Sequence, residues 1–134
     1  MYRIEHGTPN REDYIRIRKE TGLSEKSKEV AEAGLKNTIF AVSVYEKDIL
    51  VAMGRVIGDG CCFLKIVDIA VQQALQGQGI GKKVMNELVT YLHTNAPKSA
   101  YISLIADNPT NKLYEKFGFQ YVYPDSHGMY IKIE

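Results

Sequence analysis

Three closely spaced glycines form the part of the sequence with the clearest chemical meaning. Gly77, Gly79 and Gly81 lie in the segment 76–82, between a run of strand-forming residues and a helical pattern of apolar residues. A glycine-rich turn that leads from a strand into a helix presents unpaired backbone N–H groups at the positive end of the helix dipole. Such a turn is suited to bind phosphate or pyrophosphate. The alternative is a turn whose glycines only fit a tight corner.

The spacing of the glycines excludes two common phosphate-binding motifs. A dinucleotide fingerprint, G-x-G-x-x-G, that begins at Gly77 needs a third glycine where Lys82 stands. A P-loop, G-x-x-x-x-G-K-[ST], that ends at Gly81 needs glycine in place of Gln76 and Ser or Thr in place of Lys83. The segment therefore predicts a different phosphate-bearing ligand.

Two motifs together point to a known family. Gln76, Gly79 and Gly81 match the pattern Q/R-x-x-G-x-G/A, and residues 113–119 read L-Y-E-K-F-G-F. In this order, separated by a helix and a strand, they resemble the GNAT superfamily of acyl-CoA-dependent N-acyltransferases. The resemblance covers the chain from about Phe40 to the C-terminus.

Two further segments are similar to a subgroup of that superfamily. Residues 53–60 and the pair Gly128 and Met129 resemble arylalkylamine-type and plant serotonin-type acetyltransferases. The chain departs from the family pattern at Gln73, where a proline often follows the fourth strand. It also departs at Asp107, where an asparagine is common, with Asn108 one place later.

The resemblance implies acetyl-CoA as cosubstrate and a set of contacts to it. The backbone of a strand end would pair with the pantetheine amides, which requires an open strand edge. Backbone N–H groups of the glycine turn would bind the pyrophosphate, and the Lys82 side chain either adds charge or is simply solvated. The implied coenzyme-binding residues are Ile69, Ala70, Val71, Gln76, Gly77, Gln78, Gly79, Ile80, Gly81, Lys82, Asn108 and Tyr114.

Transfer of an acetyl group to an amine needs a polarised thioester carbonyl and a proton donor for the leaving thiolate. The resemblance assigns the first role to the N–H of Val71 and the second to Tyr114. A phenol with an ordinary pKa of about 10 is protonated at neutral pH and can donate to a thiolate. The alternative for Tyr114 is ordinary packing against Phe117.

Asp68 is the third candidate catalytic residue. It shares a strand face with Leu64 and Ile66, and a buried carboxylate needs partners. It could take the amine proton through water, hold the substrate ammonium, or bond a backbone N–H structurally. Candidate contacts to the acceptor substrate are Arg55, Asp59 and His127.

These residues must be positioned by elements that the periodicity predicts. Helical patterns cover residues 10–21, 26–34, 79–93 and 108–118, the last with Asn108 as its N-cap and Pro109 at its first position. Strand patterns cover residues 2–5, 38–45, 49–57, 62–71, 100–105, 119–123 and 128–133. Gly54 interrupts one strand pattern and suggests a bulge or a close backbone approach. We expect an α+β fold, a mixed, mostly antiparallel sheet flanked by helices, with a splayed central parallel strand pair as the resemblance implies.

Length, composition and charge indicate how many domains to expect and which classes of partner to exclude. The chain of 134 residues is long enough for one domain, residues 1–134, and its net charge of +1 argues against nucleic-acid binding. The apolar runs are far shorter than the roughly 20 residues that cross a bilayer, so no membrane association is expected. The N-terminal residues lack the features of a signal peptide, so we expect a cytoplasmic protein. The adjacent Cys61 and Cys62 are expected to be reduced packing residues, and the His and Cys spacing predicts no metal site.

The sequence thus predicts an acetyl-CoA-dependent N-acetyltransferase that acts on a primary amine of a small molecule by direct attack in a ternary complex. Two alternatives stay open. One is acetylation of a protein or peptide amine, and the other is a noncatalytic acyl-CoA-binding module. The last strands could offer an edge for a homodimer.

Overall fold

A five-stranded sheet lies at the centre of the part of the chain that carries the glycine turn. The computed structural model describes residues 1–107 and 109–134. The strands lie side by side in chain order, the first four antiparallel and the fifth parallel to the fourth. They are β1 (Tyr2–His6), β2 (Phe40–Glu46), β3 (Ile49–Gly58), β4 (Phe63–Val71) and β5 (Tyr101–Ser103). The predicted α+β class with a parallel β4–β5 pair is confirmed.

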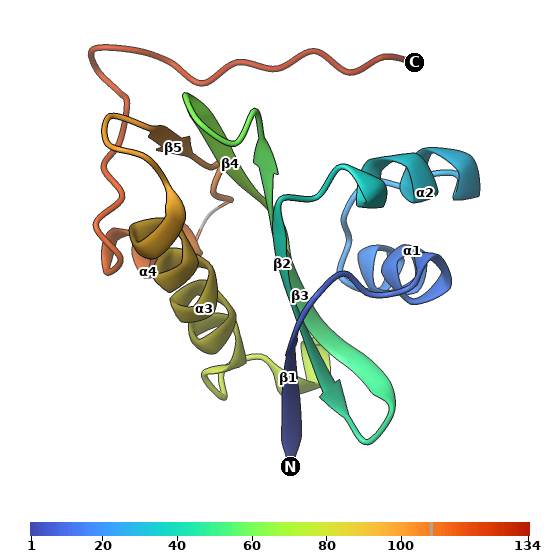
Figure 1. Ribbon diagram of the computed structural model, residues 1–134. Coiled ribbons are helices and arrows are strands. Elements are labelled where there is room, and N and C mark those ends of the chain that lie inside the picture. The colour runs from blue at the N-terminus through green and yellow to red at the C-terminus, as the bar shows by residue number, and fades with distance from the viewer. Residues whose placement is uncertain (108) are drawn as a thin grey trace. The chain divides into compact units, whose positions relative to one another are not determined.

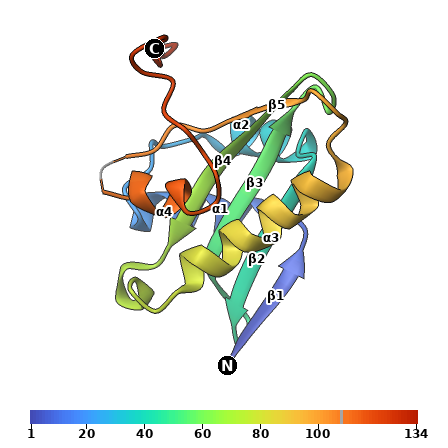
Figure 2. The ribbon, with the colours of Figure 1, turned by 90° about the vertical axis from the view of Figure 1, so that its left-hand side faces the viewer.

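Helices cover both faces of this sheet. As Figures 1 and 2 show, α1 (Arg11–Glu20) and α2 (Lys28–Lys36) lie on one face, and α3 (Ile80–Asn95) lies on the other. The side chains of Asn10 and Ser27 accept hydrogen bonds from the backbone N–H groups of Asp13 and Val30, and so begin α1 and α2. The crossover from β4 to β5 passes through α3, as the strand–helix–strand pattern predicts.

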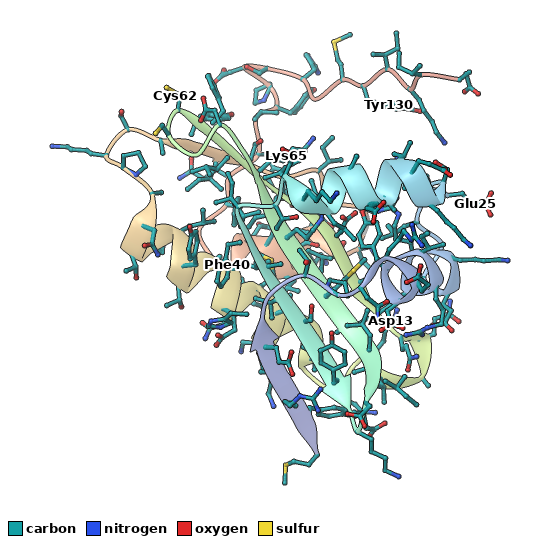
Figure 3. The ribbon with its side chains drawn as sticks, turned by 45° about the vertical axis from the view of Figure 1, so that its right-hand side comes forward. Asp13, Glu25, Phe40, Cys62, Lys65 and Tyr130 are labelled. Carbon is teal, nitrogen blue, oxygen red and sulfur yellow. The ribbon has the colours of Figure 1, made fainter. Side chains whose placement is uncertain are left out.

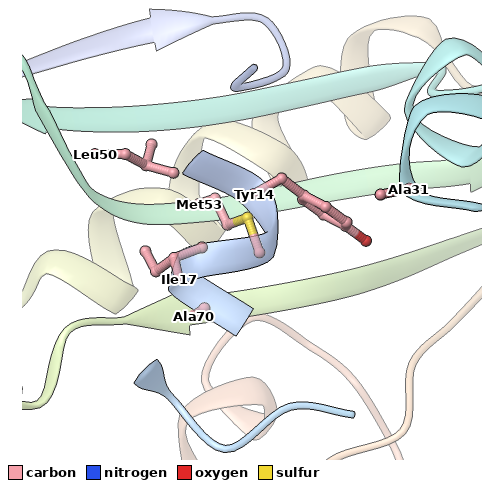
Figure 4. Close-up of a cluster of buried hydrophobic side chains, with 6 residues drawn as sticks. All are labelled: Tyr14, Ile17, Ala31, Leu50, Met53 and Ala70. Carbon is pink, nitrogen blue, oxygen red and sulfur yellow. The ribbon is translucent and has the colours of Figure 1, made fainter. Parts of the chain in front are cut away.

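Each sheet face has its own apolar layer. On the α3 side the predicted helical stripe is buried, with Ile80, Val84, Met85, Leu88 and Leu92 facing the sheet. On the other side Figure 4 shows α1 packed onto β3 and β4 through a second cluster. That cluster consists of Tyr14, Ile17, Ala31, Leu50, Met53 and Ala70.

Gly54 marks the place where the β3–β4 ladder is irregular. Met53 pairs with Ala70 and Arg55 pairs with Val67, so one residue of β3 faces two residues of β4, and Asp68 there has a φ of 60°. A Cβ at Gly54 would lie 2.6 Å from Ile69 Cδ1, within the van der Waals contact distance. The predicted bulge and the close approach are both present, and they place Asp68 and Ile69 outside the regular ladder.

The chain divides into two compact units, Met1–Leu104 and Ile105–Glu134, which are described separately. The second unit contains α4 (Asn111–Glu115), and Gly118 follows it with a φ of 93°, as expected for the residue that ends this helix. The predicted N-cap Asn108 lies outside the described residues. A single domain over residues 1–134 stays a prediction.

Two sequence expectations in the second unit are wrong. Residues 119–123 and 128–133 have the alternation of strands, yet neither forms a strand. A strand exists only when a neighbour pairs its backbone, and the described residues supply none for these segments. Their apolar pattern is therefore left without a sheet among the described residues.

The two cysteines also differ from expectation. Cys61 and Cys62 are free, but both are exposed at the bend between β3 and β4, where Figure 3 labels Cys62. They are not packing residues, because the hairpin loop runs from residue 59 to 62 and lies beyond the sheet. Within the described ranges, no helix has the length and apolar character needed to span a bilayer.

Candidate active site

The glycine turn leads into α3 with its backbone N–H groups free. Gly77 and Gly79 have φ values of 83° and 84°, and Gly79 is the N-cap of α3 without a side-chain hydrogen bond. Such φ values suit glycine because a Cβ is strained there. Among the residues that the structure describes, none accepts a hydrogen bond from the N–H groups of residues 77–82. These six donors at the start of a helix of 16 residues can bind an anion.

Gln76 connects this turn to the end of β4. Its side-chain Nε2 donates a hydrogen bond to the carbonyl oxygen of Val71 over 3.1 Å. Gln76, the first residue of the glycine motif, thus has a structural role, because its side chain holds the turn beside the end of β4. The backbone N–H groups that follow are then carried next to Val71.

The edge of β4 next to this turn is open. β5 pairs with residues 63–65 of β4, whereas residues 66–71 have no ladder partner on that side among the described residues. The backbone of Ile69, Ala70 and Val71 therefore has one side available to an extended amide ligand. The side chain of Ile69 packs beside Gly54, while its backbone belongs to this edge.

A buried ionic cluster lies on the other face of the sheet, at the bulge. Asp68 receives a hydrogen bond from Arg55 Nε over 2.8 Å and one from the Tyr14 hydroxyl over 2.6 Å. Arg18 Nη1 also donates to its carboxylate. The side chains of Asp68 and Arg18 are each 8% exposed, and that of Arg55 is 9% exposed. A carboxylate buried with two guanidinium groups and a phenol has its partners inside the protein.

The two arginines also bind α2 and the residues on either side of it. Arg18 donates to the carbonyl oxygen of Ser24, and Arg55 donates to the carbonyl oxygen of Gly34 and the hydroxyl of Thr38. The cluster thus links the chain before and after α2 to the bulge in β4. The cluster thereby ties the helices on this face of the sheet to β4, the strand that carries the open edge.

The ring of Tyr14 lies close to both guanidinium groups. The Cζ atoms of Arg18 and Arg55 lie 5.6 and 5.5 Å from the centre of its ring, within the range of cation–π contacts. Burial, followed by the hydrogen bond to Asp68, raises the pKa of the Tyr14 hydroxyl. The phenol therefore stays protonated and donates to the carboxylate at neutral pH.

Tyr14 and Arg18 are the site residues that the sequence analysis did not single out. They lie four residues apart on α1 and so share one face of the helix. A cation on the otherwise apolar face of a helix is the signal that could have found them. Its partner, Asp68, could not be paired with it by spacing, because 50 residues separate the two.

The remaining candidates lie in several places. Asp59 is at the tip of the β3–β4 hairpin, where it accepts the N–H groups of Cys61 and Phe63, which hold its pKa below the usual value. The structure does not bring Asp59 together with Arg55. Lys82 is exposed on the first turn of α3. In the second unit Tyr114 is on α4, and the exposed His127 packs edge-on against the ring of Tyr123.

A cavity lies beside the ionic cluster, because Thr38, which accepts a hydrogen bond from Arg55, is part of its lining. It has a volume of about 270 Å³ and opens where β1 ends and β2 begins. Its lining comprises His6, Gly7, Thr8, Leu35, Thr38, Ile39, Phe40 and Ala41. Since β3 separates β2 from β4 in the sheet, we do not assign this cavity to the glycine turn. No cluster of three His, Cys, Asp or Glu side chains that could hold a metal occurs in the described part of the chain.

Comparison with known proteins decides the family. Residues 13–132 match the model of the acetyltransferase (GNAT) domain. The chain belongs to the GNAT acetyltransferase family. A crystal structure of a protein of unknown function from methicillin-resistant Staphylococcus aureus, a probable acetyltransferase, is 48% identical with a TM-score of 0.94. The match covers 99% of this chain and 100% of that one.

More distant GNAT structures share the fold. A GNAT family acetyltransferase from Streptococcus pneumoniae is 22% identical, with a TM-score of 0.78 over 100% of this chain and 98% of that one. Glucosamine-6-phosphate N-acetyltransferase from Arabidopsis thaliana is 18% identical, with a TM-score of 0.71 over 100% of this chain and 99% of that one. GNAT acetyltransferases use acetyl-CoA as cosubstrate. The free N–H groups of the turn and the open edge of β4 fit the pyrophosphate and the amide chain of such a donor.

Proposed function

We propose that this GNAT acetyltransferase transfers the acetyl group of acetyl-CoA to a primary amine of a small molecule, by direct attack in a ternary complex. The observation that carries the proposal is the set of free N–H groups of residues 77–82 beside the open edge of β4. An anion-binding site next to an unpaired strand edge suits a ligand that joins a diphosphate to an extended amide chain. The donor supplies the acetyl thioester, and the chain's own groups position and polarise it.

The backbone from Ile69 to Val71 binds the amide chain, and the N–H groups of the glycine turn bind the diphosphate. Lys82, exposed on the first turn of α3, adds positive charge near this diphosphate site. The N–H of Val71 then polarises the thioester carbonyl, a contact that contributes about 3 kcal/mol to transition-state stabilisation in well-placed cases. The hydrogen bond from Gln76 to the Val71 carbonyl holds this strand end in place.

We assign Asp68 a positioning role rather than that of a base. Two guanidinium groups and a phenol hydroxyl already donate to its carboxylate, which leaves little of it free to take a proton from an amine. Arg55 is likewise occupied by Asp68, Gly34 and Thr38. These contacts support a cluster that fixes the bulge in β4 and the chain around α2.

Tyr114 is proposed as the acid that protonates the leaving thiolate. Support comes from its place in the L-Y-x-K-x-G-F motif and from burial, which raises the pKa of its hydroxyl above the ordinary value. A phenol with a raised pKa carries its proton throughout the neutral range, so it is in the donor form when the thiolate leaves.

The acceptor is the part of the proposal that rests on resemblance alone, in residues 53–60 and 128–129. The decisive experiment measures release of free thiol from acetyl-CoA with amino acids, polyamines, arylalkylamines, aminosugars and peptides as acceptors. We expect turnover with a small free amine that exceeds turnover with peptides carrying the same amine. Faster turnover of peptides would support the peptide alternative, and tight coenzyme binding without thiol release would support a noncatalytic module.

A further inference from the structure

Two glutamine side chains connect the glycine turn before α3 to two different strands of the sheet. Gln76 Nε2 donates a hydrogen bond to the carbonyl oxygen of Val71 in β4. Gln78 Oε1 accepts one from the hydroxyl of Tyr2 over 3.4 Å. Tyr2 is the first residue of β1, which β2 and β3 separate from β4 in the sheet. All four residues belong to the unit Met1–Leu104, so both contacts lie within one unit.

The position of Tyr2 is set by the sheet. It pairs with Glu46 of β2, and its side chain lies on the same sheet face as that of His6, because side chains alternate along a strand. His6 bonds Glu87 of α3 over 2.6 Å, so this is the face that α3 covers. Figures 1 and 2 show the start of β1 close to the segment that leads into α3. The Tyr2 side chain is partly buried there, whereas the other four residues of β1 are exposed.

The turn needs such contacts because its glycines do not hold one conformation by themselves. Gly77 and Gly79 flank Gln78 and have φ values of 83° and 84°, in a region that glycine enters and leaves freely. Ordering a loose loop when a ligand binds costs free energy, so N–H groups that are already in place bind an anion more tightly. Among the described residues, the side-chain hydrogen bonds of the segment 76–82 are those of Gln76 and Gln78.

We propose that Tyr2 is a positioning residue for the coenzyme, because its hydroxyl, acting through the Gln78 side chain, holds the glycine turn in the form that binds the diphosphate. The inference rests on the proposed coenzyme site at residues 77–82, and it is independent of the acceptor and of the role given to Tyr114. It adds β1 to the elements that build this site. The bond is long and exposed, so loss of the Tyr2 hydroxyl weakens binding of coenzyme A without abolishing it.

Titration of the ¹⁵N-labelled chain with two ligands, followed by NMR, tests this role. Coenzyme A carries the diphosphate, whereas pantetheine carries only the amide chain and the thiol. We expect Tyr2→Phe to raise the dissociation constant of coenzyme A about fivefold, read from the N–H signals of residues 77–82, and to leave that of pantetheine unchanged. Tyr91→Phe removes a hydroxyl near the other end of α3, where the ring stacks on Phe40, and is expected to change neither constant.

The outcomes separate this role from the proposed function. Failure of the unmodified chain to bind coenzyme A would refute the coenzyme site itself, and this inference with it. Normal binding that Tyr2→Phe leaves unchanged overturns the inference alone. Equal losses for coenzyme A and pantetheine would show a general disturbance of the fold, and would also overturn it.

A double-mutant cycle shows whether Tyr2 acts through Gln78. Gln78→Ala removes the acceptor of the hydrogen bond and is also expected to weaken binding of coenzyme A. In the Gln78→Ala background, Tyr2→Phe is expected to cause no further loss, because both changes remove the same contact. A further fivefold loss, about the same as in the unmodified chain, would contradict the connection through Gln78. Thermal unfolding followed by circular dichroism verifies that each variant is folded.

Discussion

At the scale of single residues, the contacts of a side chain decide among the roles that its chemical type allows. The carboxylate of Asp68 suits a base, an ammonium binder or a structural acceptor, and its three donors in the buried cluster favour the last. Tyr114 is similar, because a phenol on a helix is either packing or acid. Its raised pKa is compatible with an acid that works at neutral pH. Each role has its own experimental signature.

Replacing Asp68 by asparagine is expected to destabilise the fold. The change leaves Arg18 and Arg55 buried without a counter-charge, and breaking a buried ion pair costs about 3 kcal/mol or more. Urea unfolding measures this loss, with Asp48→Asn as control because the Asp48 side chain is 99% exposed. An Asp68→Asn variant as stable as the unmodified protein but unable to release thiol would instead identify a catalytic base.

Replacing Tyr114 by phenylalanine is expected to reduce turnover about 100-fold, the lower end of the range for a lost general acid. The dissociation constant for coenzyme A should change little. Because the acid must be protonated, turnover of the unmodified enzyme should fall as pH rises above 10, through the raised pKa of Tyr114. Steady-state thiol release and calorimetric binding check both points. Tyr121→Phe, another tyrosine of the same unit, is the control, and equal turnover in the two variants would refute the assignment.

At the scale of elements, the site depends on irregular places in regular structure. The bulge at Gly54 interrupts the β3–β4 ladder, and the short β5 pairs with only one end of β4. The left-handed Gly79 begins α3 without a side-chain cap, so the first N–H groups of the helix are free for a ligand. A regular sheet and a capped helix would bury the backbone groups that the proposed coenzyme site requires.

The left-handed turn before α3 can be tested with a matched pair of glycines. Gly79→Ala and Gly60→Ala both place a Cβ at a φ near +83°, with no atom within 4 Å of it in either case. Each costs about 1 kcal/mol of backbone strain. We expect Gly79→Ala to weaken binding of coenzyme A about tenfold, as the turn relaxes, and Gly60→Ala, in the β3–β4 hairpin, to leave it unchanged. Equal affinities measured by calorimetry would place the diphosphate elsewhere.

At the scale of the whole molecule, binding and stability are linked. A ligand that binds only the folded chain stabilises it by about 2.7 kcal/mol at 100 times its dissociation constant. We expect acetyl-CoA to raise the melting temperature in a thermal-shift assay, whereas ATP and NAD at the same concentration have much smaller effects. We expect smaller effects of ATP and NAD because the spacing of the glycines matches neither the P-loop nor the dinucleotide-binding motif. A larger shift with NAD or ATP would contradict the proposed donor.

Local periodicity and motif spacing determined most elements of residues 1–104, the position of the glycine turn and the family. They could do so because caps, turns and apolar stripes act over a few residues. The pairing of Arg18 with Asp68 depended on the tertiary structure, since residues 50 positions apart meet only when α1 packs on the sheet. Arg55 meets the same carboxylate across the irregular β3–β4 ladder, whose register the periodicity left open. The end of the chain makes the same point in reverse. Residues 128–133 carry a strand pattern, but a strand also needs a neighbour to share its hydrogen bonds, and the sequence pattern alone cannot supply one.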